Sequence, residues 1–451
     1  MSRGWISHGA VVGWASVVAA AAASIPALCL AAEITDVADA ADTERIGNFS
    51  RDDAFDLYLG AEFESQLGQG RITREPIDRP GIDPNDPTAC TERNARDCRP
   101  VDELNYKRVV NLLNLSGQMG LYHDLAITFG WHFVIGDSLK FSWAKNLGPD
   151  NSTIEPATGP VLFEHNFASK HMGPGPIDLG LKWAPLSDER DESKPSWVLY
   201  FNWANPWGEK TYNPSDRASS SSPGPVGDGV HRLTFGMALS KRVANLGLIG
   251  IDPNLPRRGY MDPYFDLSYT LPVPQQGYAR AENMPNSSFG ELPSHIGRIS
   301  AGFEVVPLED IKQGNKLAID LGLRATYYSQ GRNYSELTDP LEELTYTDQY
   351  MYVGGIFGIY AQLAQFTRLK ASVVAGYVTS HFLTNEDVGH DLNNDGQVTV
   401  ADDSMNPYFC GNTTGDTCSR LGVYPYDQVG FRFRDERHIL VKLFVSLMFA
   451  F

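Results

Sequence analysis

The sequence has little of several features that mark whole classes of protein. It carries 37 Lys and Arg against 55 Asp and Glu, a formal net charge of −18 in 451 residues. A nucleic-acid-binding protein needs a basic surface, so this balance argues against one. Beyond residue 32, no apolar run approaches the roughly 18 residues of a membrane-spanning helix, and no long stretch shows the 3.6-residue period of a helix.

The N-terminus has the three-part layout of a secretory signal. Arg3 precedes an apolar run over 10–23, small residues lead up to Ala32, and polar residues follow from Glu33. This layout is typical of a signal peptide that is cleaved on export. A single anchoring helix is the alternative, but Pro26 interrupts the run. We therefore predict a signal peptide at 1–32, a periplasmic segment at 33–52 and a folded domain at 53–451.

Cysteine is scarce, and its spacing is informative. Of the five cysteines, Cys29 lies in the predicted signal peptide, and the other four form two close pairs in turn-rich stretches. Disulfides form in exported proteins, whereas a zinc site would need ligand spacings that are absent here. The sequence predicts two local disulfides, namely Cys90–Cys98 and Cys410–Cys418.

The rest of the chain alternates between two-residue periodicity and loops rich in Pro, Gly, Asn, Asp and Ser. Alternation of apolar and polar residues is the signature of a strand with two different faces. About twelve segments show it: 55–64, 106–118, 121–135, 176–185, 196–205, 231–243, 260–271, 296–306, 316–329, 346–362, 369–382 and 434–451.

The strands of a soluble β-sandwich also alternate apolar and polar residues. The length of the strands and the composition of their second face favour a membrane barrel instead. The strands are long enough to cross a bilayer at a tilt, and their second face is rich in Gly, Ser, Thr and single charges. The last strand ends with Phe449 and Phe451, which resembles the assembly signal of bacterial outer-membrane barrels. We predict an all-β fold, an antiparallel transmembrane β-barrel of about 12 strands with long extracellular loops and short periplasmic turns.

Connection lengths give a second, independent indication. The long connections are 65–105, 136–175, 206–230, 272–295, 330–345 and 383–433, and a shorter connection lies between each of them and the next. Outer-membrane barrels have long outer loops and short periplasmic turns. An even number of strands therefore places all the long loops, and both predicted disulfides, outside the cell.

The face predicted to point into the barrel carries both signs of charge. Bare charges in a low-dielectric interior are costly unless they are paired or hydrated. The alternatives are thus a salt-bridged plug or the lining of a narrow channel that sets its selectivity. The predicted lumen residues are Glu62, Asp178, Lys182, Arg232, Asp266, Arg298, Glu304, Asp320, Arg324, Lys370 and Lys442.

One acidic stretch in the last long loop has the spacing of a calcium-binding loop. Oxygen-bearing side chains stand at loop positions 1, 3, 5, 9 and 12, and Gly396 stands at position 6, where such loops turn sharply. The stretch resembles the loops of EF-hand and dockerin modules; a solvated acidic loop is the alternative. The predicted ligands of a structural Ca²⁺ are Asp391, Asn393, Asp395, Gln397 (through its carbonyl), Thr399 and Asp402.

Signs of catalysis are weak. Several barrel enzymes use a nucleophile paired with a base at the rim. His123, His132, His231 and His381 could act as bases, but none lies in a motif with a serine partner. We predict that the protein is not an enzyme.

Two short patterns resemble known families of outer-membrane proteins. A Gly-rich turn into a strand over 173–185, a second strand from Trp197 to Phe201 and the Pro206-Trp-Gly208 that follows are similar to the outer-membrane transporters of the phenol-degradation (MetA-pathway-like) group. The stretch 120–125 with Phe129-Gly130 resembles uncharacterised myxobacterial-type outer-membrane proteins. The resemblance implies a barrel that passes small hydrophobic compounds.

Taken together, the sequence predicts an exported barrel in the outer membrane of a Gram-negative bacterium. We expect a channel or transporter for small solutes, hydrophobic ones included. A closed barrel that binds partners or serves a structural role through its stiffened loops is the alternative. The expected partners are outer-membrane lipid, the barrel-assembly machinery and a small-molecule solute, with no nucleic acid.

Overall fold

The structure is a computed structural model, and it describes most of the chain beyond residue 56. The described residues are 57–75, 100–122, 124–145, 147–156, 161–187, 193–207, 211, 222–244, 260–275, 293–310, 315–342, 344–363, 366–385, 389–390, 404–405, 426 and 431–450. The predicted signal peptide and periplasmic segment lie outside them.

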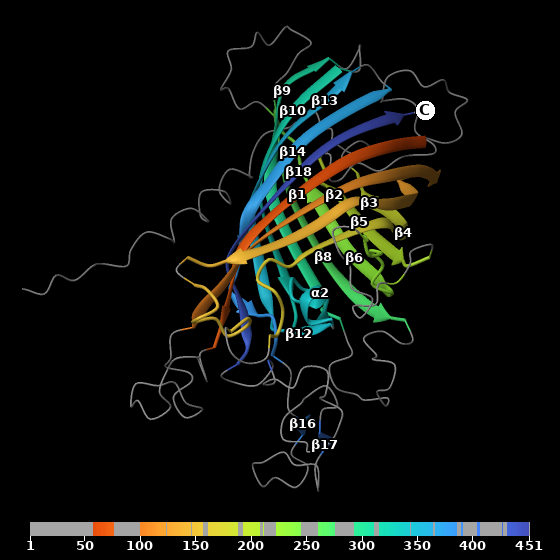
Figure 1. Ribbon diagram of the computed structural model, residues 1–451. Helices are drawn as coiled ribbons and strands as arrows, with labels where there is room; N and C mark the ends of the chain where they lie inside the picture. The colour runs from red at the N-terminus through yellow and green to blue at the C-terminus, as the bar shows by residue number, and fades with distance from the viewer. Residues whose placement is uncertain are drawn as a thin grey trace, which may run out of the picture.

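Twelve long antiparallel strands form one closed barrel (Figure 1). Each strand pairs with the next along the chain, and the first pairs with the last over most of its length, so the sheet has no free edge in the barrel wall. The strands are β1 (Leu57–Arg74), β2 (Val101–Tyr122), β3 (Leu125–Trp143), β4 (Ala168–Leu186), β5 (Ser196–Asn205), β6 (Val230–Ser240), β8 (Tyr260–Pro274), β9 (Ile296–Asp310), β10 (Asn315–Tyr328), β13 (Tyr350–Leu363), β14 (Thr367–Val378) and β18 (Phe433–Ala450).

The predicted fold class is confirmed, and all twelve predicted strands occur in the predicted order. The main errors concern the first two long connections. The sequence placed 65–105 and 136–175 in loops, but β1 to β4 extend well into both ranges, to Arg74, Val101, Trp143 and Ala168. Their extra residues alternate less cleanly than those before them, because bulges shift the pairing near Gly70 and between Val134 and Asp137.

The outer face of the barrel is an apolar belt. On β10, Leu317, Leu321, Leu323 and Tyr327 are exposed, and Leu323 is the most exposed of them at 67%. The alternate residues of the same strand, among them Asp320 and Arg324, point to the opposite face, since side chains of a strand alternate. Soluble proteins rarely expose so much contiguous apolar surface, whereas a barrel that faces lipid requires it.

The third error concerns 330–345, which was predicted as a plain outer loop. It holds a small folded unit, in which β11 (Gly331–Asn333) pairs with β12 (Thr345–Thr347) and the one-turn helix α2 (Thr338–Leu341) lies between them. In Figure 1 this unit lies at the lower end of the barrel, opposite to the end that carries the C-terminus. All four residues of α2 are buried, so the unit is packed against the protein.

Four two-residue strands complete the described elements: β7 (Val243–Ala244), β15 (His381–Phe382), β16 (Gly389–His390) and β17 (Ser404–Met405). The first two join the barrel sheet beside β8 and β18, and the last two pair with each other. Among the described residues, no helix has the length and apolarity needed to cross a membrane.

Inside the barrel, a tyrosine repeatedly crosses a glycine to reach an aspartate two strands away. Tyr200 of β5 stands opposite Gly236 of β6, and its hydroxyl donates to Asp266 of β8 at 2.7 Å. Tyr264 of β8 likewise stands opposite Gly302 of β9, and its hydroxyl donates at 2.8 Å to an aspartate of β10. The glycines are needed because a tyrosine ring lies where their side chain would be.

The contact at Gly236 predicts a specific loss of stability. A methyl group there would lie 2.2 Å from the ring Cζ of Tyr200. We expect Gly236→Ala to lower the free energy of unfolding by about 1–3 kcal/mol, as other overpacked sites do. Urea titration of the refolded protein in lipid vesicles, followed by tryptophan fluorescence, measures this change.

The matched control is Gly297→Ala on β9, where a methyl group would meet no atom within 4 Å. Combining Gly236→Ala with Tyr200→Ala should remove the clash, so that the alanine at 236 adds little further loss. An equal loss at both glycines would contradict the crossing contact.

Candidate functional site

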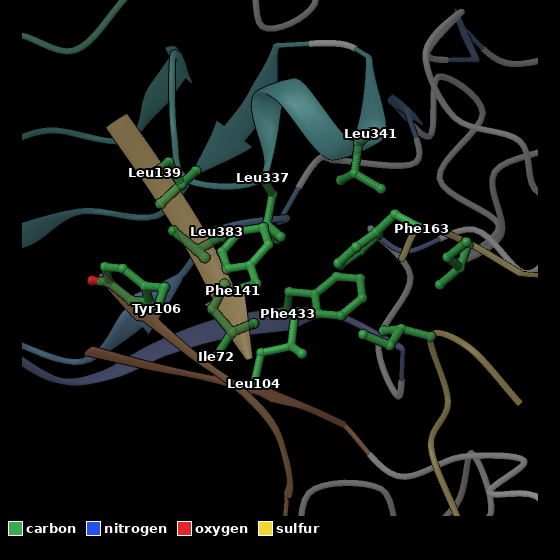
Figure 2. Packing of buried hydrophobic residues seen from close by; sticks show 12 residues of the cluster. Ile72, Leu104, Tyr106, Leu139, Phe141, Phe163, Leu337, Leu341, Leu383 and Phe433 are labelled. Atoms are coloured by element: carbon green, nitrogen blue, oxygen red, sulfur yellow. The ribbon is translucent and has the colours of Figure 1, made fainter. Parts of the chain in front are cut away.

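The end of the barrel that carries the long connections is closed by a hydrophobic core, which we call the mouth core. Twelve described residues form it, and Figure 2 shows Leu337 and Leu341 of the α2 region lying close to Leu383 and Phe433. The wall contributes the inward-facing ends of β1, β2, β3 and β18. The members are Ile72, Leu104, Tyr106, Leu139, Phe141, Ile154, Leu162, Phe163, Leu337, Leu341, Leu383 and Phe433.

We call 329–349 the mouth segment; two of the polar contacts that hold it to the barrel wall involve charged groups. Arg108 of β2 forms a two-pronged ion pair with Asp137 at 2.7 and 3.0 Å, and its other nitrogen lies 3.6 Å from Glu336 of the segment. The imidazole Nε2 of His171 on β4 lies 2.9 Å from the carboxylate of Asp339 in α2. The segment is therefore fixed by charge as well as by apolar packing.

Sequence analysis missed this role of the mouth segment. The available signal was the density of large apolar residues in a range read as a loop, namely Tyr334, Leu337, Leu341 and Leu344. Solvated loops rarely carry such residues at short intervals. Their partners on the wall come from β1, β2, β3 and β18, none of which is near 334–344 in the chain, so no local pattern could have identified them.

The connection between β3 and β4 closes another side of the mouth. The buried carboxylate of Glu103 accepts hydrogen bonds from the backbone and hydroxyl of Thr153 and from the hydroxyl of Ser152. In the same connection, burial acts to raise the pKa of Glu155, but the backbone N–H and the imidazole of His165 outweigh it, so the pKa lies below its ordinary value.

Beneath the mouth segment lies a cavity of about 190 Å³, which we call the lumen cavity. One water needs roughly 10–15 Å³ by this measure, so the space can hold a small organic molecule. Its walls come from β9, β10, β13, β14 and β18, and the mouth segment forms its cover. Residues of both kinds line it, polar ones such as Arg324 and Glu336 and apolar ones such as Val374 and Leu440.

Three cations line the lumen cavity without a carboxylate partner at ion-pair distance. Arg298 and Lys442 form no hydrogen bond or ion pair with any residue, as far as the described chain shows, and Arg324 donates only to the hydroxyl of Ser300 at 3.3 Å. Asp266 lies within electrostatic range of both arginines, but it already accepts the hydrogen bond from Tyr200. The cavity therefore has a surplus of positive charge.

An aromatic stack forms one wall of the lumen cavity. The rings of Tyr328 and Tyr350 lie 4.6 Å apart and nearly parallel, at 13°, and Tyr350 stacks in turn on His381 at 4.1 Å and 20°. All three residues line the cavity. Aromatic side chains and cations without an ion-pair partner thus line the same space.

Three of the predicted lumen residues, Glu62, Asp178 and Lys182, belong to hydrogen-bonded networks away from this cavity. Asn114 donates to Glu62 at 3.1 Å, and His132 bridges Asn114 and Asp178 at 2.8 and 2.5 Å, which links β1 to β4 across the interior. Lys182 donates to Gln118 at 3.3 Å.

The remaining predicted lumen residues divide between pairs and the cavity. Arg232 forms an ion pair with Asp228, Glu304 lies 3.9 Å from Lys316, and Lys370 stands opposite Tyr360 and Ser446 in the sheet. The tyrosines described above bind Asp266 and Asp320. Only Arg298, Arg324 and Lys442 of the predicted set meet at the cavity.

Other predicted sites fall largely outside the described residues. These are the calcium ligands Asp391, Asn393, Asp395, Gln397, Thr399 and Asp402, the cysteines Cys90, Cys98, Cys410 and Cys418, and Phe451. Phe449 is described and lies exposed on the outer face of β18. Within the described ranges, no cluster of His, Cys, Asp or Glu could hold a metal ion.

Comparison with known proteins finds likeness only among solved structures. The sequence matches no protein-family profile and no curated protein. An outer membrane channel from Pseudomonas putida F1 is 12% identical with a TM-score of 0.38, over 88% of this chain and 95% of that one. A FadL homologue from Pseudomonas aeruginosa is 10% identical with a TM-score of 0.30, over 88% and 90%.

A third structure, the outer membrane protease OmpT from Escherichia coli, is 9% identical with a TM-score of 0.27, over 90% of this chain and 98% of that one. Similarity at this level assigns neither a family nor a function to the chain.

The mouth core predicts which change would release the mouth segment. Leu337 is fully buried there, so Leu337→Ala should weaken the packing by about 2–5 kcal/mol. We expect limited proteolysis to cut the variant within 331–347 while the heat-modifiable gel migration of the barrel persists. Leu323→Ala on the lipid-facing side of β10 is the control and should leave the segment protected. Resistance of the Leu337 variant would show that the core does not hold the segment.

Proposed function

We propose that this protein is an outer-membrane channel for small solutes, and that the mouth segment controls entry. Several features support the proposal. The closed barrel has an apolar outer belt, as a lipid-facing barrel must. Twelve strands enclose more space than the side chains of an eight-stranded barrel fill, but less than the wide channel of the 16-stranded porins.

The observation that carries the proposal is the lumen cavity directly beneath the mouth segment. The cavity lies inside the barrel and carries cations that no described residue neutralises by direct contact. Its cover is a separate folded unit that contacts the wall through Glu336 and Asp339 and through single backbone hydrogen bonds such as Asp348 to Phe382, and it forms no ladder with the long barrel strands. A cover of this kind can move without breaking the barrel.

A closed barrel that acts through its outer connections is the second candidate. The mouth core favours it, because a packed apolar cluster excludes water from the end of the barrel. In this case the long connections would form the working surface. The predicted calcium site and the two predicted disulfides would then stiffen that surface, and they remain proposals here, as do assembly through Phe449 and Phe451 and export by a cleaved signal.

Planar-bilayer recording of the full-length mature protein tests the channel. We expect wild-type protein to give small or brief current steps. The double variant Glu336→Gln/Asp339→Asn loses both charged contacts of the mouth segment, and a loss of about 1.4 kcal/mol would raise the open fraction about tenfold. Single-channel open times measure the change directly.

Asp102→Asn is the matched control, because it breaks an ion pair with Arg71 between two wall strands and leaves the mouth segment untouched. Its recordings should resemble those of the wild type. Silence of both the wild type and the double variant, in protein whose heat-modifiable migration shows a folded barrel, would reject the channel in favour of the second candidate.

A further inference from the structure

We propose that the lumen cavity is a binding site for small carboxylates that carry a flat apolar body. This inference deepens the proposed function, since it names the class of solute that a channel of this structure takes. It is argued from the charge, the wall and the size of the cavity.

The charge of the cavity departs from that of the rest of the interior. Several cations of the barrel have a carboxylate within ion-pair distance: Lys316 has Glu304, and the guanidinium of the buried Arg242 faces Asp262. Arg108, which also lines the cavity, has Asp137 and Glu336. Arg298, Arg324 and Lys442 differ, because none of them has a carboxylate at ion-pair distance among the described residues, although Glu336 and Asp435 also line the cavity.

Like charges gathered in a confined space repel one another unless an anion joins them. Two of the three are arginines, whose planar guanidinium matches a carboxylate with two parallel hydrogen bonds. Arg298 is exposed to the lumen, and Arg324 and Lys442 are half-buried, so a solute can reach all three. The charge therefore favours an anion, and the arginines favour a planar oxyanion such as a carboxylate.

The wall of the cavity favours a particular kind of group as the remainder of the carboxylate solute. The stacked rings of Tyr328, Tyr350 and His381 and the aliphatic side chains of Val374 and Val378 lie among the same lining residues. Because the rings cover one another's faces, mainly their edges are available, and aromatic groups also pair edge to face. A fully hydrated inorganic anion would leave this surface unused, whereas an aromatic or cyclic carboxylate covers it.

The size of the cavity fits such a solute. One water needs roughly 10–15 Å³ by this measure, so a space of about 190 Å³ has room for a single ring with a short substituent. The mouth segment supplies Asn333, Tyr334, Ser335 and Glu336 to the same lining. A bound solute would thus touch both the wall and the cover, which couples binding to the position of the cover.

Isothermal titration of the detergent-purified full-length mature protein with benzoate at pH 7 tests the site. We expect saturable binding of benzoate, and at least about tenfold weaker binding of benzyl alcohol, which has the ring without the charge. Acetate, which has the charge without the ring, should also bind about tenfold more weakly. Equal affinity for benzoate and benzyl alcohol would overturn the proposal without any variant.

Variants then locate the binding. Arg324→Gln and Lys442→Gln should each weaken benzoate binding about tenfold, since each removes one charged contact. Arg324→Lys keeps the charge but loses the paired donors, so an intermediate affinity is expected. Lys182→Gln is the control, because Lys182 lies on the inner face of β4 outside the cavity lining and should leave the affinity within about twofold.

The outcomes separate this inference from the proposed function. Benzoate binding that Arg324→Gln and Lys442→Gln both weaken supports the site, even if the bilayer recordings are silent and the channel fails. Clear currents together with no benzoate binding, or with binding that both variants leave unchanged, overturn the site while the channel stands.

Discussion

The closure of the sheet by β1 and β18 is the constraint on which the rest of the structure depends. In a lipid bilayer no water satisfies a backbone N–H or C=O, so an open edge is costly and a closed barrel removes it. Pairing β1 with β18 over most of its length achieves this. Closure also fixes which face of every strand points outward, because side chains alternate and a shift of one residue would invert them. The apolar belt and the polar interior follow from the same pairing.

The polar side chains inside the barrel need hydrogen-bond partners. They find them through side-chain hydrogen bonds between different strands. Tyrosines that cross glycines to bind Asp266 and Asp320, and the chain from Glu62 through His132 to Asp178, are examples. These contacts stiffen the sheet from within, since each tyrosine contact spans two strand pairings and the chain of contacts from Glu62 to Asp178 spans three. The lumen cavity is where this pairing stops, and its cations remain available to a solute.

The mouth combines two kinds of interaction with different consequences. Apolar packing around Leu337 and Phe433 excludes water and holds the mouth segment in place. Such packing is non-directional. The contacts of Glu336 with Arg108 and of Asp339 with His171 are directional, and they connect the cover to two separate wall strands. The cover forms no ladder with the long barrel strands, and single backbone hydrogen bonds, such as the one from Asp348 to Phe382 at 2.9 Å, add to these side-chain contacts. This separates the stability of the barrel from the state of its mouth.

The sequence by itself determined the barrel, since two-residue alternation and the pattern of long and short connections are local properties that each strand carries in its own residues. It also predicted a set of inward charges, among them Arg298, Arg324 and Lys442 of the cavity lining, because a face is defined by parity along the strand. Only the tertiary structure decided which charges are paired and which share a cavity. That depends on register between strands far apart in the chain, and on glycines that let tyrosines pass. It also decided that 329–349 folds into the mouth, because the partners of Leu337 and Leu341 are supplied by closure of the barrel and by no nearby residue.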